Sequence, residues 1–164
     1  MASKLMGRSA NFVVIPFAVS ETNGLAEFSI NEADGTSSLL SFNPVAFDSD
    51  WRNVAGLKTV ESSMLPTIRL DTFMELMQLE RIDYLKIDTQ GADFMVVKSL
   101  GTRIRDVRKI MLEVDVMQTR LYQGSSGKDE IVGYMQAHGL ELTSAASQNH
   151  GKEENLTFCQ SYTD

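Results

Sequence analysis

One stretch constrains the fold of this chain more than any other. Residues 84–87 form a short, mainly apolar run that ends at Asp88, and a turn at Gly91 leads into a helix-forming segment over residues 92–100. The order strand, tight turn, helix is the half-unit of an α/β fold. Because such folds bind ligands where the carboxyl ends of strands meet helix N-termini, Asp88 is the first candidate for a functional residue.

The residues before this unit predict a strand, a hairpin and a long loop. Residues 12–19 are apolar almost throughout, as in a strand covered on both faces, although Pro16 removes one hydrogen-bond donor. The Asn23-Gly24 pair predicts a hairpin turn into an antiparallel strand over residues 26–30. Residues 31–58 predict a loop, which is either a binding segment or a connection pinned to the core by its aromatic residues, Phe42, Phe47 and Trp51.

A weak strand and a helix are predicted next. Residues 58–65 favour a strand that ends at Pro66. Asp71 is the predicted N-cap of the following helix. Helical spacing places four apolar residues on the buried face of this helix: Leu70, Phe73, Leu76 and Met77.

The remaining residues predict a second parallel strand, another helix and a closing hairpin. Residues 110–115 form the strand, and Glu113 lies near its carboxyl end. A buried acid is costly unless it is paired or hydrogen-bonded, so Glu113 belongs either to a site or to a structural polar network. Alternating residues at 140–143 and 156–159 predict an antiparallel C-terminal hairpin.

The segment Leu85-Lys86-Ile87-Asp88-Thr89-Gln90-Gly91-Ala92-Asp93 resembles the signature of the FkbM family of S-adenosylmethionine-dependent methyltransferases. Gln90 and Asp93 stand where that family usually has glutamates. Residues 16–20, the Leu70-Asp71 pair and Glu113 resemble the family in the same order, so the resemblance covers roughly residues 12–160. It implies an α/β fold with a class I (Rossmann-like) methyltransferase sheet and an antiparallel C-terminal hairpin.

The resemblance also implies an activity and a set of site residues. The activity is methyl transfer from S-adenosylmethionine to an oxygen of a small molecule or sugar. The implied catalytic group is Asp88 with four residues around it, namely Lys86, Gln90, Asp93 and Glu113. The implied cofactor contacts are Ala18, Ser37 and Ser38. The alternatives are a non-catalytic binding or assembly module, or a fragment of a longer enzyme.

We expect residues 1–11 to be an N-terminal extension and residues 12–164 to form one FkbM-like domain that lacks its first βαβα unit. In the family that unit carries the glycine-rich cofactor turn and lies between the strands that match residues 12–19 and 84–88. Without it, either these two strands pair directly or a second chain covers the exposed sheet edge. We therefore predict a homodimer.

Composition restricts the function classes and the compartment. The formal net charge of −7 argues against a broad nucleic-acid surface. A small basic cluster (Arg103, Arg105, Arg108 and Lys109) is either a solvated linker or a local anion contact.

The single cysteine, Cys159, rules out an internal disulfide and has no metal-binding spacing. No apolar run approaches the roughly 18 residues of a membrane span, and residues 1–10 do not resemble a signal peptide. We predict a cytoplasmic protein without a metal site, a membrane contact or a nucleic-acid partner.

Overall fold

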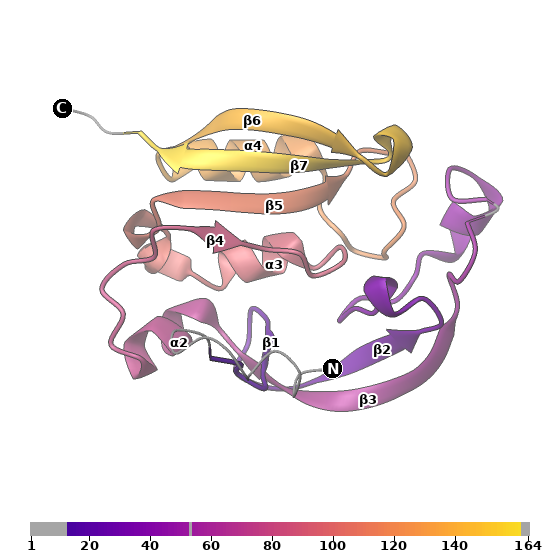
Figure 1. Cartoon of the computed structure of the whole chain (residues 1–164), viewed down its shortest axis with the longest axis horizontal. Helices are drawn as coiled ribbons and strands as arrows, with labels where there is room; N and C mark the ends of the chain where they lie inside the picture. Colours follow the sequence, from indigo (N-terminus) through magenta and orange to yellow (C-terminus); the bar gives the residue numbers. More distant parts are fainter. Residues whose placement is uncertain (1–12, 53, 162–164) are drawn as a thin grey trace.

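The computed structural model describes residues 13–52 and 54–161, which form a mixed α/β structure with two sheets (Figure 1). The smaller sheet has the strand order β1-β3-β2 and the larger sheet has the order β4-β5-β7-β6. The strands of the smaller sheet are β1 (Ala18–Val19), β2 (Gly24–Asn31) and β3 (Thr59–Ile68). Those of the larger sheet are β4 (Leu85–Lys86), β5 (Lys109–Asp115), β6 (Leu140–Gln148) and β7 (Glu153–Gln160).

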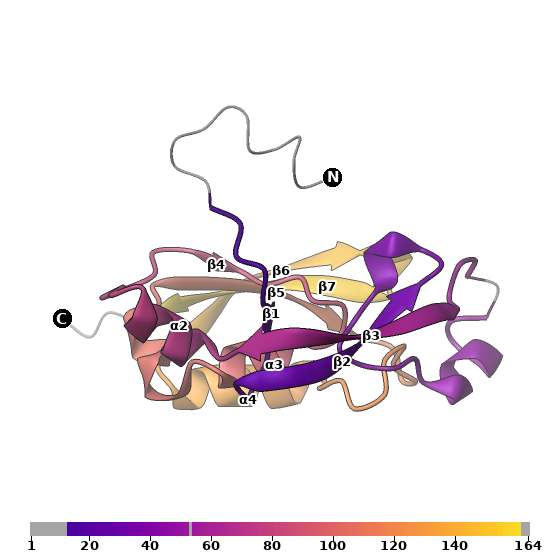
Figure 2. The same ribbon diagram turned by 90° about the horizontal axis from the view of Figure 1, so that it is seen from below.

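Three α-helices are described, α2 (Leu70–Leu76), α3 (Asp93–Lys98) and α4 (Lys128–Ala137). Short 3-10 turns are η1 (Asp34–Thr36), η2 (Pro44–Asp48), η3 (Gly101–Asp106) and η4 (Asn149–Gly151). Figure 2 shows α3 and α4 on one face of the larger sheet. None of the described helices is long and apolar enough to cross a membrane.

The main core lies between the larger sheet and these two helices. Phe94, Val97 and Leu100 are buried, as the helical spacing predicts, and they join Ile110 and Leu112 of β5 in one cluster. β5 runs parallel to β4, which confirms the prediction of two parallel strands. β7 pairs antiparallel with β5 on one side and with β6 on the other, so it lies inside the sheet.

A second, smaller core fixes the loop between β2 and β3. Trp51 is 2% exposed and packs with Leu121 and Tyr122. Its Nε1 donates to the Thr119 carbonyl at 3.2 Å, and the Lys152 Nζ lies 4.8 Å from its ring centroid. These contacts show that Trp51 anchors the loop to the core.

Pairing in the first half of the chain differs from the prediction. Only Ala18–Val19 of the expected strand over residues 12–19 is paired, and Phe12 lies outside the described residues. β1 pairs in parallel with β3, so the first of the two alternatives, direct pairing with residues 84–88, does not occur. The predicted hairpin is wrong, because β2 pairs antiparallel with β3 and not with β1. β3 lies between the two strands and pairs with every residue of β2 on one side and with both residues of β1 on the other, so β1 and β2 are not neighbours.

Two further expectations are corrected around Pro66 and Asp71. β3 continues through Pro66 to Ile68, which is tolerated because β1 pairs only from Thr67 onward and leaves one side of the strand unpaired at the proline. The helix cap is Arg69, and Asp71 lies in the first turn, where its carboxylate accepts from Arg69 Nη2 at 2.5 Å. The buried side of α2 holds Leu70 and Met74, whereas Leu76 and Met77 are exposed.

The basic cluster is partly engaged in ion pairs within the chain. The Arg103 side chain pairs with Asp106 and donates to the Leu79 carbonyl, and Arg108 pairs with Asp83 at 3.5 Å. These contacts support the structural interpretation for both arginines.

Candidate functional site

The connection from β4 to α3 is a tight turn in which two consecutive residues have left-handed backbone conformations. Gln90 has φ of 54° and Gly91 has φ of 84°. A side chain at Gly91 would place its Cβ 2.6 Å from Tyr122 Cδ2 and 2.8 Å from Tyr122 Cβ. Glycine is therefore required here both for the backbone conformation and for the close approach of Tyr122.

Asp88, at the carboxyl end of β4, is bound through both of its oxygens. The Lys86 Nζ donates to Oδ2 at 2.7 Å, and the Gln90 Nε2 donates to Oδ1 at 3.0 Å. The hydrogen bond to Asp88 raises the pKa of Lys86 above its usual range. The structure thus brings together three of the predicted site residues in one network.

Tyr122, from the loop between β5 and α4, joins this network through Gln90. Its hydroxyl donates to the Thr36 carbonyl at 2.7 Å and lies 3.3 Å from Gln90 Oε1. Its ring stacks on Phe42 with centroids 5.3 Å apart. Burial raises the pKa of Tyr122 well above its usual range, so the hydroxyl keeps its proton and serves as a donor. Nothing in the local sequence around Tyr122 indicates this role.

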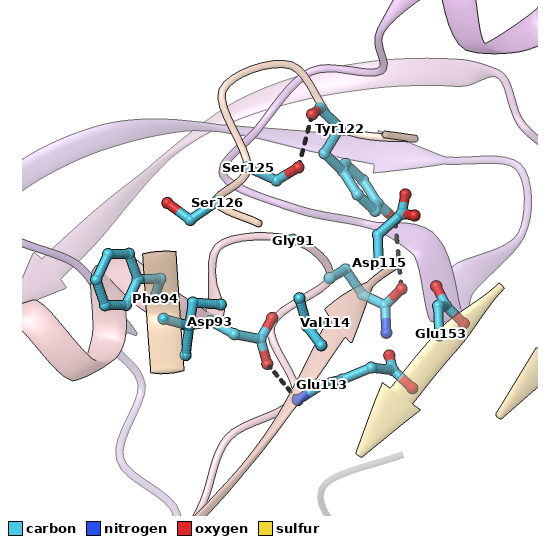
Figure 3. Close-up of a pocket in the computed structure, with 12 residues that line it drawn as sticks. Gly91, Asp93, Phe94, Glu113, Val114, Asp115, Tyr122, Ser125, Ser126 and Glu153 are labelled. Carbon is cyan, nitrogen blue, oxygen red and sulfur yellow. Dashed lines mark hydrogen bonds between the residues drawn. The ribbon is translucent and has the colours of Figure 1, made fainter. Parts of the chain in front are cut away.

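Asp93, the first residue of α3, joins the turn to β5. Its side chain is buried, and its Oδ1 accepts from the Glu113 backbone N–H at 3.4 Å (Figure 3). Its Oδ2 accepts from Thr89 Oγ1 at 3.3 Å. Desolvation by burial raises the pKa of Asp93 to about 6. These contacts make Asp93 a structural link between the turn and β5.

Glu113 lies on β5 beside β7, and its pKa lies well above the usual range for a glutamate. Burial, followed by the nearby Glu153 carboxyl, raises the pKa of Glu113 to about 7. Burial also raises the pKa of Glu153. Figure 3 shows the carboxyl groups of Glu113, Asp115 and Glu153 gathered on one side of a pocket. Glu153 was not predicted, because only the antiparallel pairing of β7 with β5 brings it there.

Two adjoining cavities meet at Gln90, Glu113 and Glu153. The narrow one, shown in Figure 3, has a volume of about 20 Å³, enough for a single water molecule. The larger one, the acidic cleft, has a volume of about 310 Å³, at the lower end of small-molecule sites. Its lining combines the carboxyl groups of Asp88, Glu113 and Glu153 with an apolar wall of Trp51, Val54, Leu57 and Leu121.

The three residues assigned to the cofactor do not converge on this cleft. The Ser38 hydroxyl donates to the Gln90 carbonyl at 2.7 Å and accepts from the Leu40 N–H, so it supports the turn. The Ser37 hydroxyl accepts from the Asn31 N–H at 3.0 Å. Ala18 lies in β1 of the smaller sheet. The described residues therefore offer S-adenosylmethionine no set of free polar groups at these positions.

The fold and the site define an α/β protein with a polar cleft lined by residues from the carboxyl ends of β4 and β5. The family model described as the methyltransferase FkbM domain matches residues 5–142, which is most of the chain. The chain belongs to the FkbM methyltransferase family, and the resemblance seen in the sequence is confirmed. Searches of curated proteins and of solved structures gave no match. No group of histidine, cysteine, aspartate or glutamate side chains suited to a metal ion occurs among residues 13–52 and 54–161.

Proposed function

We propose that this chain takes part in S-adenosylmethionine-dependent methylation of a hydroxyl group on a small molecule or sugar. Membership of the FkbM family carries the proposal. The acidic cleft supports it, because it lies where α/β folds bind their ligands and holds a carboxyl group with a pKa of about 7. The methyl donor would supply an electrophilic carbon, and the chain itself would prepare the hydroxyl.

Glu113 is the residue suited to receive the proton of an acceptor hydroxyl. A general base works best when its pKa lies near the ambient pH, and burial gives the Glu113 carboxyl this property. It faces the acidic cleft beside Gln90, so a hydroxyl bound there could reach it.

Asp88 would orient the acceptor from the rim of the cleft. Its carboxylate is held by Lys86 and Gln90, which fixes its position before a ligand arrives. A carboxylate held in this way accepts hydrogen bonds from hydroxyl groups in a defined direction. The glutamine at position 90 therefore acts as a positioning residue, since its amide donates to Asp88.

The test is transfer of a radiolabelled methyl group from S-adenosylmethionine to a panel of sugars and other hydroxyl compounds. We expect transfer by the unmodified chain and a loss of about 100-fold or more in Glu113→Gln, the range typical of a lost general base. The matched control is Glu141→Gln, an exposed glutamate on β6, which should keep the full rate. No transfer by a folded chain, or equal loss in the control, would contradict the proposal.

The second candidate is a non-catalytic binding or assembly module. The engagement of the Ser37 and Ser38 hydroxyls with the chain's own backbone favours it. Under this alternative the folded chain binds neither S-adenosylmethionine nor its product and acts only through a partner.

A further inference from the structure

The described chain carries an extended apolar segment and an open sheet edge that complement each other. The 13–17 segment consists of Val13, Val14, Ile15, Pro16 and Phe17, which precede β1. Val13 is 72% exposed and Phe17 is 47% exposed, and Val14 and Ile15 are exposed as well. Figure 2 shows this segment leaving the body of the molecule above β1, and within it the Phe17 N–H donates to the Ile15 carbonyl at 2.9 Å, which makes a turn at Pro16. A run of exposed β-branched and aromatic residues has the composition of a strand without a partner.

β4 presents an open edge, as β6 does on the other side of the larger sheet. It pairs only with β5, so it forms one edge of the larger sheet. The Ile87 N–H donates to the Met111 carbonyl of β5 at 2.8 Å. Since successive N–H groups point to opposite edges of a strand, those of Lys86 and Asp88 point to the open edge. A strand edge with free N–H groups is a template for another strand.

We propose that a second copy of this chain covers the β4 edge with its own 13–17 segment. The segment is anchored at Ala18 to β3 in the other sheet and runs away from the molecule, so it does not reach β4 of its own chain. Two copies related by a two-fold axis would exchange segments reciprocally and bury both edges. The same contact gives the predicted homodimer a specific geometry.

Two details of the sequence suit this arrangement. Pro16 lacks an N–H group and can therefore lie in a strand that has a neighbour on one side only. A segment added to the β4 edge would be such a strand, because it would become the new edge of the sheet. The charged side chains on the β4 edge, Lys86 and Asp88, are paired with each other at 2.7 Å. Covering the edge therefore leaves no isolated charge without a partner.

The test compares the mass in solution of the full chain and of two matched variants by light scattering over a range of concentrations. Ile15→Lys places a charge in the segment, where Ile15 is 37% exposed, and Leu25→Lys places one at a more solvent-exposed apolar position on β2, where Leu25 is 68% exposed. We expect a dimer for the unmodified chain and for Leu25→Lys, and a monomer for Ile15→Lys. A monomer for the unmodified chain, or equal disruption by both variants, would overturn the proposal.

Hydrogen exchange at the Lys86 and Asp88 amides reports on the edge itself and needs no substitution. We expect these amides to exchange at least about tenfold faster when the chain is diluted until it dissociates. Protection that persists in the monomer would overturn the proposal, because the edge would then be covered from within the chain.

Discussion

Gly91→Ala tests the close approach of Tyr122 to the turn that forms the site. The added Cβ would lie 2.6 Å from Tyr122 Cδ2 and 2.8 Å from both Cγ and Cβ of the same residue. The Tyr122 Cβ is attached to the backbone, so the side chain cannot rotate out of the way. Either the turn or the loop that carries Tyr122 must shift.

The expected cost has two parts. An alanine in the left-handed region costs about 1–2 kcal/mol, because φ at this position is +84°. Forcing an extra carbon into a packed contact costs about 1–3 kcal/mol more. We therefore expect Gly91→Ala to lower the free energy of unfolding by about 2–5 kcal/mol.

Gly124→Ala is the matched control for the backbone part. Gly124 has φ of +80°, and a Cβ there would meet no atom within 4 Å. Urea unfolding of both variants, monitored by circular dichroism, gives the two free energies. Gly124→Ala should show only the backbone cost of about 1–2 kcal/mol. Equal destabilisation in the two variants would refute the assigned contact with Tyr122.

Three further predictions concern the groups around the site. Tyr122→Phe should destabilise by about 1 kcal/mol in urea unfolding, because the Thr36 carbonyl loses its donor, and no change would refute that hydrogen bond. The pKa of Asp93 is about 6 in the folded chain, above its value of 3.8 in the unfolded chain, so the folded state holds an extra proton between these values. Protonation of Asp93 therefore stabilises the folded state fully below pH 3.8, and this stabilisation, at most about 3 kcal/mol, is lost as the pH rises through 6. Asp93→Asn should remove this part of the pH dependence of the free energy of unfolding. Lys152→Met should destabilise by about 1–2 kcal/mol, since it removes the donor to the Asp50 carbonyl and the cation over the Trp51 ring; an unchanged urea midpoint would refute these contacts.

The sequence predicted the parts of the site that are contiguous in the chain. The β4 strand, the glycine turn and α3 follow from local residue order, and Lys86, Asp88 and Gln90 are close because they alternate along one short segment. Glu113 was predicted because a buried acid is costly unless it is paired or has a role in a site, and because the FkbM resemblance includes it.

Contacts between distant residues could not be predicted in this way. Tyr122 reaches Thr36 across 86 positions, and Ser38 reaches Gln90 across 52. Glu153 enters the cleft only because β7 inserts between β5 and β6. The partner of β1 could not be predicted for the same reason, because strand partners depend on which edges distant segments leave free.

Isothermal titration of the folded chain with S-adenosylhomocysteine tests the proposed methyltransferase function most directly, because it requires no knowledge of the acceptor. Circular dichroism on the same sample shows that the chain is folded. The account predicts saturable binding at micromolar strength, equivalent to roughly 8 kcal/mol. A folded chain that gives no binding heat up to about 1 mM ligand, a strength of only about 4 kcal/mol, would contradict it and favour the non-catalytic module.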